Sequence, residues 1–100
     1  MEIRLSRPCI EDPLLYIAEC NLEKKVDIEK LCTMLREIGA IDLKCSVKLG
    51  VARFLLEGRS VMIYKSGRMD IRKIRNTGEA ETIMKKILET VKESLIDISF

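Results

Sequence analysis

The apolar residues of this chain recur at two spacings, and the two spacings predict different secondary structures. Alternation with polar residues predicts strands, and we expect five of them, over residues 14–22, 42–49, 51–57, 60–65 and 69–74. Recurrence every three or four residues predicts two helices, over about residues 27–38 and 77–95. The expected element order is therefore β-α-β-β-β-β-α.

The connections between the last four strands are short, which predicts antiparallel pairing. Together with two amphipathic helices, these strands predict an α+β fold: a five-stranded antiparallel sheet with both helices packed on one face. The opposite face of the sheet is expected to stay open. Residues 1–13 contain two prolines, so we expect an irregular arm or an edge strand there, followed by a single domain over residues 14–100.

Capping residues mark the expected helix ends. Asp27 is a favourable N-cap for the first helix, and Gly39 is a favourable stop. Asn76 is followed three residues later by Glu79, the pattern of a capping box for the second helix. In the strand over residues 42–49, alternation places four residues on the core side: Leu43, Cys45, Val47 and Leu49.

Composition and charge add a functional lead. The chain has 100 residues, of which 47% are hydrophobic and 34% charged, as in a well-ordered globular domain. Its net charge is only +2, but the charges are segregated along the sequence. Residues 1–43 carry six basic and nine acidic residues, residues 44–75 carry nine and two, and residues 76–100 carry three and five. The strongly basic middle third is typical of a surface that binds a polyanion.

The chemistry-bearing residues argue against an enzyme and against a metal or cofactor site. The chain has no His, and its four cysteines are far apart, with no closely spaced pair of metal ligands. We expect Cys20, Cys32 and Cys45 to behave as small free hydrophobes on apolar faces, and Cys9 to be exposed. The N-terminus does not resemble a secretory signal and no segment is long and apolar enough to span a membrane, so a cytoplasmic location is expected.

Two stretches of the sequence resemble one repeat of the TATA-box-binding protein family. The first is Cys20-Asn-Leu-Glu-Lys-Lys-Val-Asp-Ile-Glu-Lys-Leu31, and the second is the hairpin Val61-Met-Ile-Tyr-Lys-Ser-Gly-Arg-Met-Asp-Ile71 with the helix after it. The resemblance extends over most of residues 14–95 and agrees in element order. It implies a TBP-like fold, and a two-repeat saddle whose open sheet face is pressed into the DNA minor groove. A chain with one repeat would need a homodimer to form such a saddle.

Carried over to this sequence, the resemblance also implies positions on the open face. Tyr64 falls on one of the family's wedge Phe residues, and Asp70 and Arg72 fall where the family has Val and Thr. Leu15 falls on a groove-reading Asn, and the second wedge Phe is absent near Val47. The family's hairpin has a three-residue loop, here placed at Ser66-Gly67-Arg68, with Gly supplying a positive φ. In that register Val61, Ile63, Met69 and Ile71 face the helices, and Met62, Tyr64, Asp70 and Arg72 face outward.

The open face is therefore the expected binding surface of a small non-enzymatic domain. We expect the face for nucleic acid or another partner to comprise Lys44, Lys48, Arg53, Met62, Tyr64, Arg68 and Arg72. We expect an apolar dimer patch to comprise Leu15, Ile17 and Leu55. The expected partners are DNA or RNA and a second copy of the chain. The alternative is a protein-interaction module with no nucleic-acid role.

Overall fold

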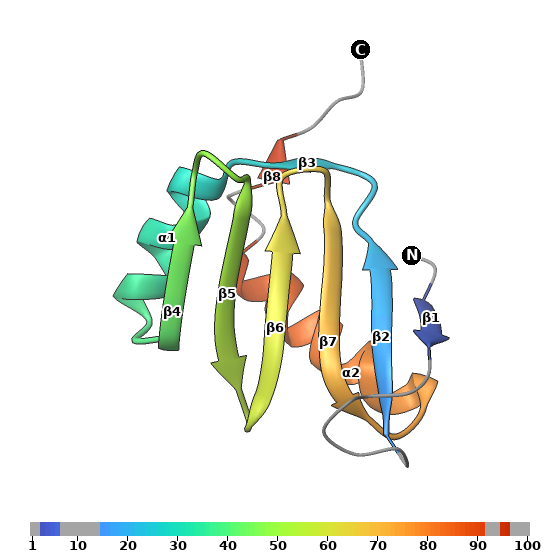
Figure 1. Cartoon of the computed structure of the whole chain (residues 1–100). Helices are drawn as coiled ribbons and strands as arrows, with labels where there is room; N and C mark the ends of the chain where they lie inside the picture. The colour runs from blue at the N-terminus through green and yellow to red at the C-terminus, as the bar shows by residue number, and fades with distance from the viewer. Residues whose placement is uncertain (1–2, 7–14, 92–94, 97–100) are drawn as a thin grey trace.

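The computed structural model describes residues 3–6, 15–91 and 95–96. It is an α+β fold built on a six-stranded antiparallel sheet, with strand order β1-β2-β7-β6-β5-β4. Two helices lie on one side of this sheet and leave its other face open, as Figure 1 shows. The strands of the sheet are β1 Ile3–Ser6, β2 Tyr16–Asn21, β4 Ile41–Ser46, β5 Val51–Leu56, β6 Arg59–Tyr64 and β7 Arg68–Ile74. The helices are α1 Ile28–Glu37 and α2 Thr77–Val91.

The predicted fold class is confirmed, with one strand more than expected in the sheet. The additional strand is β1, which pairs antiparallel with β2 at the edge of the sheet. A second, two-stranded sheet joins β3 Lys25–Val26 to β8 Leu95–Ile96. The expected helix over residues 77–95 is therefore too long, because α2 ends at Val91 and Leu95 is part of a strand.

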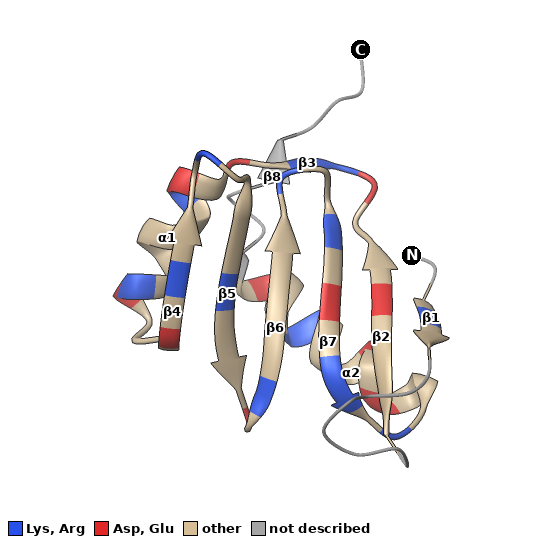
Figure 2. Cartoon of the chain, viewed as in Figure 1, with Lys and Arg blue, Asp and Glu red and all other residues tan. Residues whose placement is uncertain are grey.

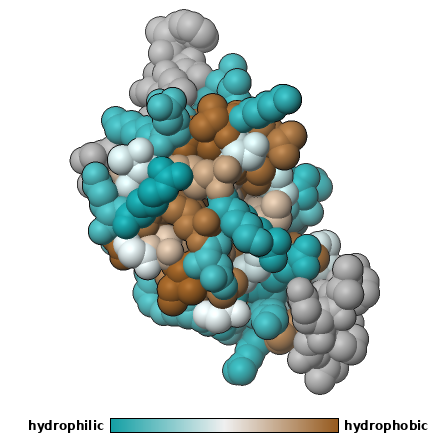
Figure 3. All heavy atoms as spheres, turned by 60° about the vertical axis from the view of Figure 1, so that its left-hand side comes forward, coloured by the Kyte–Doolittle hydropathy of each residue, from teal (hydrophilic) through white to brown (hydrophobic). Residues whose placement is uncertain are grey.

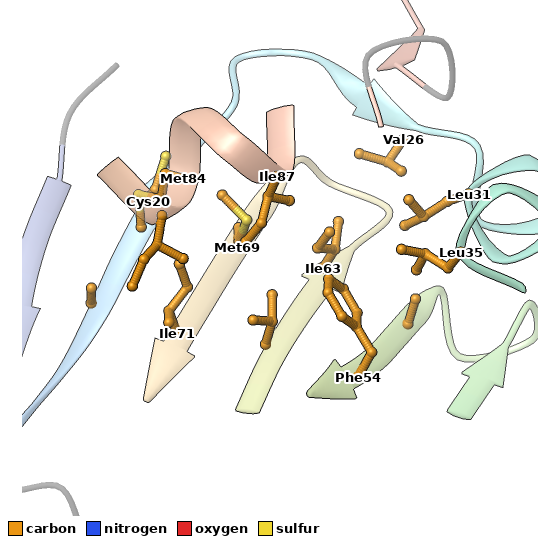
Figure 4. Packing of buried hydrophobic residues seen from close by; sticks show 14 of the residues in the cluster. Cys20, Val26, Leu31, Leu35, Phe54, Ile63, Met69, Ile71, Met84 and Ile87 are labelled. Carbon is orange, nitrogen blue, oxygen red and sulfur yellow. The ribbon is translucent and has the colours of Figure 1, made fainter. Parts of the chain in front are cut away.

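The core lies between the sheet and the two helices, as Figure 4 shows. Ile63 of β6 and both Met69 and Ile71 of β7 are completely buried. Leu31 and Leu35 of α1 close the core from the other side. The helix-facing side of the central strands is thus apolar, which fixes the orientation of the opposite side chains toward the open face.

The hairpin of β6 and β7 has the predicted faces but a different turn. Val61 pairs with Ile71 and Ile63 pairs with Met69, so the turn is residues 65–67 and not the expected residues 66–68. The turn closes one residue earlier because the Gly67 N–H donates to the Tyr64 carbonyl oxygen at 2.9 Å, with Gly67 at a φ of +97°. Both arrangements place the same residues toward the helices.

Turn geometry also changes the neighbouring strands. The β5–β6 turn consists of Glu57 and Gly58, both at positive φ, as a two-residue loop of type I′ requires. The turn was expected at Gly58 and Arg59. Glu57, expected as the last residue of a strand, therefore lies in the turn, and its carboxylate accepts a hydrogen bond from Lys86 Nζ of α2 at 3.1 Å.

Strand β4 is shorter than expected. It ends at Ser46, whose carbonyl oxygen accepts from the Gly50 N–H at 2.8 Å and whose hydroxyl accepts from the Leu49 N–H at 3.1 Å. This turn takes Val47 and Leu49 out of the alternation, and they are 61% and 78% exposed. Their predicted place in the core is wrong.

Both helix starts follow the predicted caps. The Asp27 carboxylate accepts from the Lys30 N–H at 3.1 Å, and the Asn76 side-chain oxygen accepts from the Glu79 N–H at 2.8 Å. Helix α1 stops before Gly39, which has a φ of +72°.

Two of the cysteines form a disulfide, which corrects the expectation of free thiols. Cys32 of α1 is bonded to Cys45 of β4, with their Cα atoms 6.4 Å apart. Spacing along the sequence did not reveal this pair, because the two residues meet only when α1 packs on the sheet. Cys20 is free and buried, and Cys9 lies outside the described residues.

Among the described residues, no helix is long and apolar enough to cross a membrane.

Candidate binding face

One row of side chains crosses the open face at the middle of the strands. In the strand register each member of the row pairs with the next. From β4 to β1 the members are Lys44, Arg53, Met62, Asp70, Glu19 and Arg4. The row therefore places two cations on β4 and β5, an apolar residue on β6, two carboxylates on β7 and β2, and a third cation on β1. Figure 2 shows blue on β4 and β5, red on β7 and β2, and further blue on β1 and on β7 to either side of its red band.

The basic side of the row continues into two turns at one end of the sheet. Lys48 lies in the β4–β5 turn and Lys65 in the β6–β7 turn. The two turns are adjacent, since the Lys65 N–H donates to the Gly50 carbonyl oxygen at 2.7 Å. We refer to the following four exposed residues as the cationic strip: Lys44, Lys48, Arg53 and Lys65.

The cationic strip is not neutralised from within the described residues. None of its four side chains has a carboxylate within ion-pair distance there. Arg53 has a neutral partner, because its Nε donates to the Ser60 hydroxyl oxygen at 3.3 Å. Adjacent like charges without counter-ions raise the local positive potential and attract anionic ligands.

The carboxylates on β7 and β2 are organised by Arg68. Arg68 Nε donates to Asp70 Oδ1 at 3.0 Å, and its Nη2 donates to Glu19 Oε1 at 3.0 Å. The same guanidinium lies 5.7 Å from the centroid of the Tyr64 ring, and the Tyr64 hydroxyl donates to Asp70 Oδ2 at 3.4 Å. We refer to Glu19, Asp70, Arg68 and Tyr64 as the carboxylate cluster.

Ionisation in the carboxylate cluster reflects these contacts. The hydrogen bond and the charge of Asp70 raise the pKa of Arg68, so this guanidinium stays charged. Burial raises the pKa of Tyr64, and the nearby charge of Asp70 raises it further. Asp70 is itself only 14% exposed, because the Arg68 and Tyr64 side chains contact it. Arg4 lies opposite Glu19 on β1, and Arg72 lies two residues from Asp70 on β7, so these two carboxylates are placed among three cations.

The expected binding residues lie at different parts of the open face. Lys44 and Arg53 are adjacent, Met62 and Tyr64 lie next to them on β6, and Arg72 is half-buried on β7. Arg68 was expected to bind a partner, but here it already contacts two carboxylates. The sequence analysis did not include Lys65, because its closeness to the β4–β5 turn depends on strand pairing.

The three residues of the expected dimer patch are not adjacent. Ile17 is on β2 and Leu55 is on β5, with β7 and β6 between them. Leu15 lies beside the β5–β6 turn, in a hollow that it shares with Glu57 and Arg59. Figure 3, in which the β4 side of the molecule comes forward, shows hydrophobic surface areas separated by hydrophilic side chains. Within the described residues, the large hydrophobic side chains that are most exposed are Ile38, Ile41, Val47 and Leu49.

The described residues show no site for a metal ion, since no group of three or more His, Cys, Asp or Glu side chains comes together there. One open hollow on this face is lined by charged residues of three strands, Arg4, Glu19 and Arg68. This geometry suits contact with an extended charged partner and not enclosure of a small molecule.

Comparison with solved structures identifies the fold. Methanococcus jannaschii TBP matches 81% of this chain with a TM-score of 0.66 and 20% sequence identity. The chain has a TBP-like fold. It spans 47% of the length of M. jannaschii TBP, so it corresponds to about half of that protein. At this level of identity the likeness shows the fold alone. No protein-family model and no curated protein matches the chain.

Proposed function

We propose that this protein is a non-enzymatic binding domain that binds nucleic acid through the cationic strip. The observation that supports the proposal is the set of four exposed cations without carboxylate partners in the described residues, two of which, Lys44 and Arg53, lie in a row with Met62 on the uncovered sheet face. Lys and Arg side chains contact phosphates, and a neighbouring aromatic ring gives a base a surface on which to stack. The TBP-like fold is consistent with this use of the face.

The number of cations gives the expected salt dependence. Each phosphate that a protein neutralises on a single strand contributes about −0.7 to the slope of log K against log salt concentration. Four contacts from the cationic strip therefore predict a slope of about −3. A slope near zero would mean that binding, if any, does not involve phosphates.

The test is a fluorescence anisotropy titration of labelled single-stranded and duplex oligonucleotides over a salt series. The double variant Lys44→Glu with Arg53→Glu should weaken binding and reduce the slope by about 1.4, since two phosphate contacts are lost. The matched control is Lys30→Glu with Arg36→Glu, which makes the same charge change on exposed positions of α1. The proposal fails if neither form of nucleic acid binds at low salt, or if the two double variants behave alike.

We also propose that the protein associates as a homodimer through the outer edge of β4. This strand has no partner on its outer side in the described sheet, and Ile41, Val47 and Leu49 are exposed beside it. Unpaired strand edges with apolar neighbours favour association with another chain. Two copies joined there would bring their Lys44 side chains, and hence their cationic strips, to one interface.

Analytical ultracentrifugation over a range of protein concentrations tests this association. We expect a concentration-dependent dimer that Ile41→Lys with Leu49→Lys disrupts, and that Ile17→Lys on the distant strand β2 leaves intact. A monomer at every concentration would contradict the homodimer. A dimer without any binding of nucleic acid would favour the alternative, a protein-interaction module.

A further inference from the structure

We propose that a nucleic-acid strand bound by the cationic strip continues over the end of the sheet, onto Lys24 and Lys25 of the segment that leads into α1. This inference rests on the proposed function, because it assigns two further phosphate contacts to the same ligand. It follows from three backbone segments that meet at one end of the sheet (Figure 1). They are the β4–β5 turn over residues 47–50, the β6–β7 turn over residues 65–67, and residues 22–26, which include β3.

Backbone hydrogen bonds hold the three segments side by side. The Lys65 N–H donates to the Gly50 carbonyl oxygen at 2.7 Å, which joins the two turns. The Val26 N–H donates to the Lys65 carbonyl oxygen at 3.0 Å. The Leu22 N–H donates to the Gly67 carbonyl oxygen at 2.8 Å. The β6–β7 turn therefore lies between the β4–β5 turn and residues 22–26.

Each of the three segments presents lysine side chains to solvent. We refer to these four exposed residues as the lysine rim: Lys24, Lys25, Lys48 and Lys65. In β3, Val26 is buried and Lys25 is exposed, so Lys25 faces away from the core. The stem of Lys65 lies against the β4–β5 turn, since a Cβ atom added at Gly50 would be 3.0 Å from the Lys65 Cβ. The lysine rim shares Lys48 and Lys65 with the cationic strip, so the two sets form one continuous track.

The lysine rim keeps its positive charge within the described part of the chain. None of its four side chains has a carboxylate within ion-pair distance there. Two carboxylates flank β3: Glu23, which is exposed, and Asp27, which accepts from the Lys30 N–H as the cap of α1. Figure 2 shows blue on all three segments and red on either side of β3. Four lysines against two carboxylates leave this edge with a net positive charge, which attracts a polyanion.

The number of contacts distinguishes the whole track from the cationic strip alone. A strand that extends from Lys44 and Arg53 over the lysine rim meets six cations, whereas the cationic strip offers four. Each phosphate neutralised on a single strand contributes about −0.7 to the slope of log K against log salt concentration. The expected slope is therefore about −4 for a strand that reaches all six cations, and about −3 for one that reaches only four.

The experiment measures this slope for two labelled oligothymidines, one of about five and one of about fifteen nucleotides, with the full chain. The short strand has too few phosphates for six contacts, so we expect a slope of about −3 for it and about −4 for the long strand. Lys24→Gln with Lys25→Gln should reduce the slope of the long strand to about −3 and leave the slope of the short strand unchanged.

Two further variants separate charge from structure. Lys24→Arg with Lys25→Arg keeps both charges and should keep the steeper slope of the long strand. Arg36→Gln with Lys85→Gln is the matched control, since it removes two exposed cations from α1 and α2 and should leave both slopes unchanged.

The outcomes distinguish this inference from the proposed function. Equal slopes for the two lengths would overturn the extension over the lysine rim while leaving binding by the cationic strip in place. The same effect of the Lys24→Gln, Lys25→Gln variant and the control on the long strand would also overturn it. Absence of binding for both oligonucleotides at low salt would refute the proposed function, and with it this inference.

Discussion

Gly67 is the position where a single added methyl group should disturb the fold most directly. It has a φ of +97°, and a Cβ atom placed there would overlap the carbonyl oxygen of Lys24. That oxygen belongs to the backbone of the segment between β2 and α1, so no side-chain rotation relieves the overlap. The same segment is bonded to the turn, because the Leu22 N–H donates to the Gly67 carbonyl oxygen at 2.8 Å and the Val26 N–H donates to the Lys65 carbonyl oxygen at 3.0 Å.

The effect of Gly67→Ala on the free energy of unfolding has two parts. An L-residue in the left-handed region costs roughly 1–2 kcal/mol. Moving the two segments apart weakens two backbone hydrogen bonds, each with a net contribution of about 1 kcal/mol. Together these predict a loss of roughly 3–4 kcal/mol. Gly58→Ala is the control, since Gly58 has a φ of +77° but nothing within 4 Å of an added Cβ, and the strain alone should cost about 1–2 kcal/mol.

Urea unfolding measures the difference between the two variants. We expect both m-values to match that of the wild type, and the midpoint of Gly67→Ala to fall clearly below that of Gly58→Ala. Equal losses of stability in the two variants would refute the reasoning, because the overlap with Lys24 would then contribute nothing.

Three further predictions concern the core, the disulfide and the carboxylate cluster. Ile63→Ala should lower the free energy of unfolding by about 2–5 kcal/mol, since the side chain is completely buried; a loss below about 1 kcal/mol in urea unfolding would place Ile63 outside the core. Replacing Cys32 and Cys45 together by Ser should lower the free energy of unfolding by about 3 kcal/mol, as expected for a closed loop with a sequence separation of 13. Adding reductant to the wild type should have a similar effect. Unchanged unfolding under reductant would argue against the disulfide. The raised pKa of Tyr64 means that its protonated form stabilises the fold, so this stabilisation is present below about pH 10 and is lost as the pH rises through the folded-state value. Asp70→Asn should lower the pKa of Tyr64 only in part, because burial is the larger cause of the shift. An ultraviolet titration that finds phenolate in the native protein well below about pH 10 would contradict the raised pKa.

Local features of the fold could be predicted from the sequence because local residues determine them. Asp27 and Asn76 cap their helices with their own side chains, and alternation in the β6–β7 hairpin gave the correct faces although the turn was placed one residue late. The end of β4 was missed because the Ser46 hydroxyl and Gly50 close a turn inside an apparently regular alternation.

Features that depend on contacts between distant segments could not be predicted. The two-residue strands β3 and β8 are too short to carry a pattern of their own. The bond between Cys32 and Cys45 depends on how α1 packs on the sheet. The order of charges on the open face depends on the pairing of β2 with β7, which brings Glu19 next to Asp70. The sequence did not show that Glu19 and Asp70 would share the guanidinium of Arg68, which the fold brings between them.

Amide chemical-shift mapping by NMR tests the central claim most directly. Titration of the isotopically labelled protein with oligothymidine should shift the amide signals of β4, β5 and β6 and of the two turns that hold Lys48 and Lys65. The signals of α1 and α2 should change little, because the helices lie on the opposite side of the sheet. Shifts concentrated on the helices, or no shifts at low salt, would contradict binding of nucleic acid by the open face.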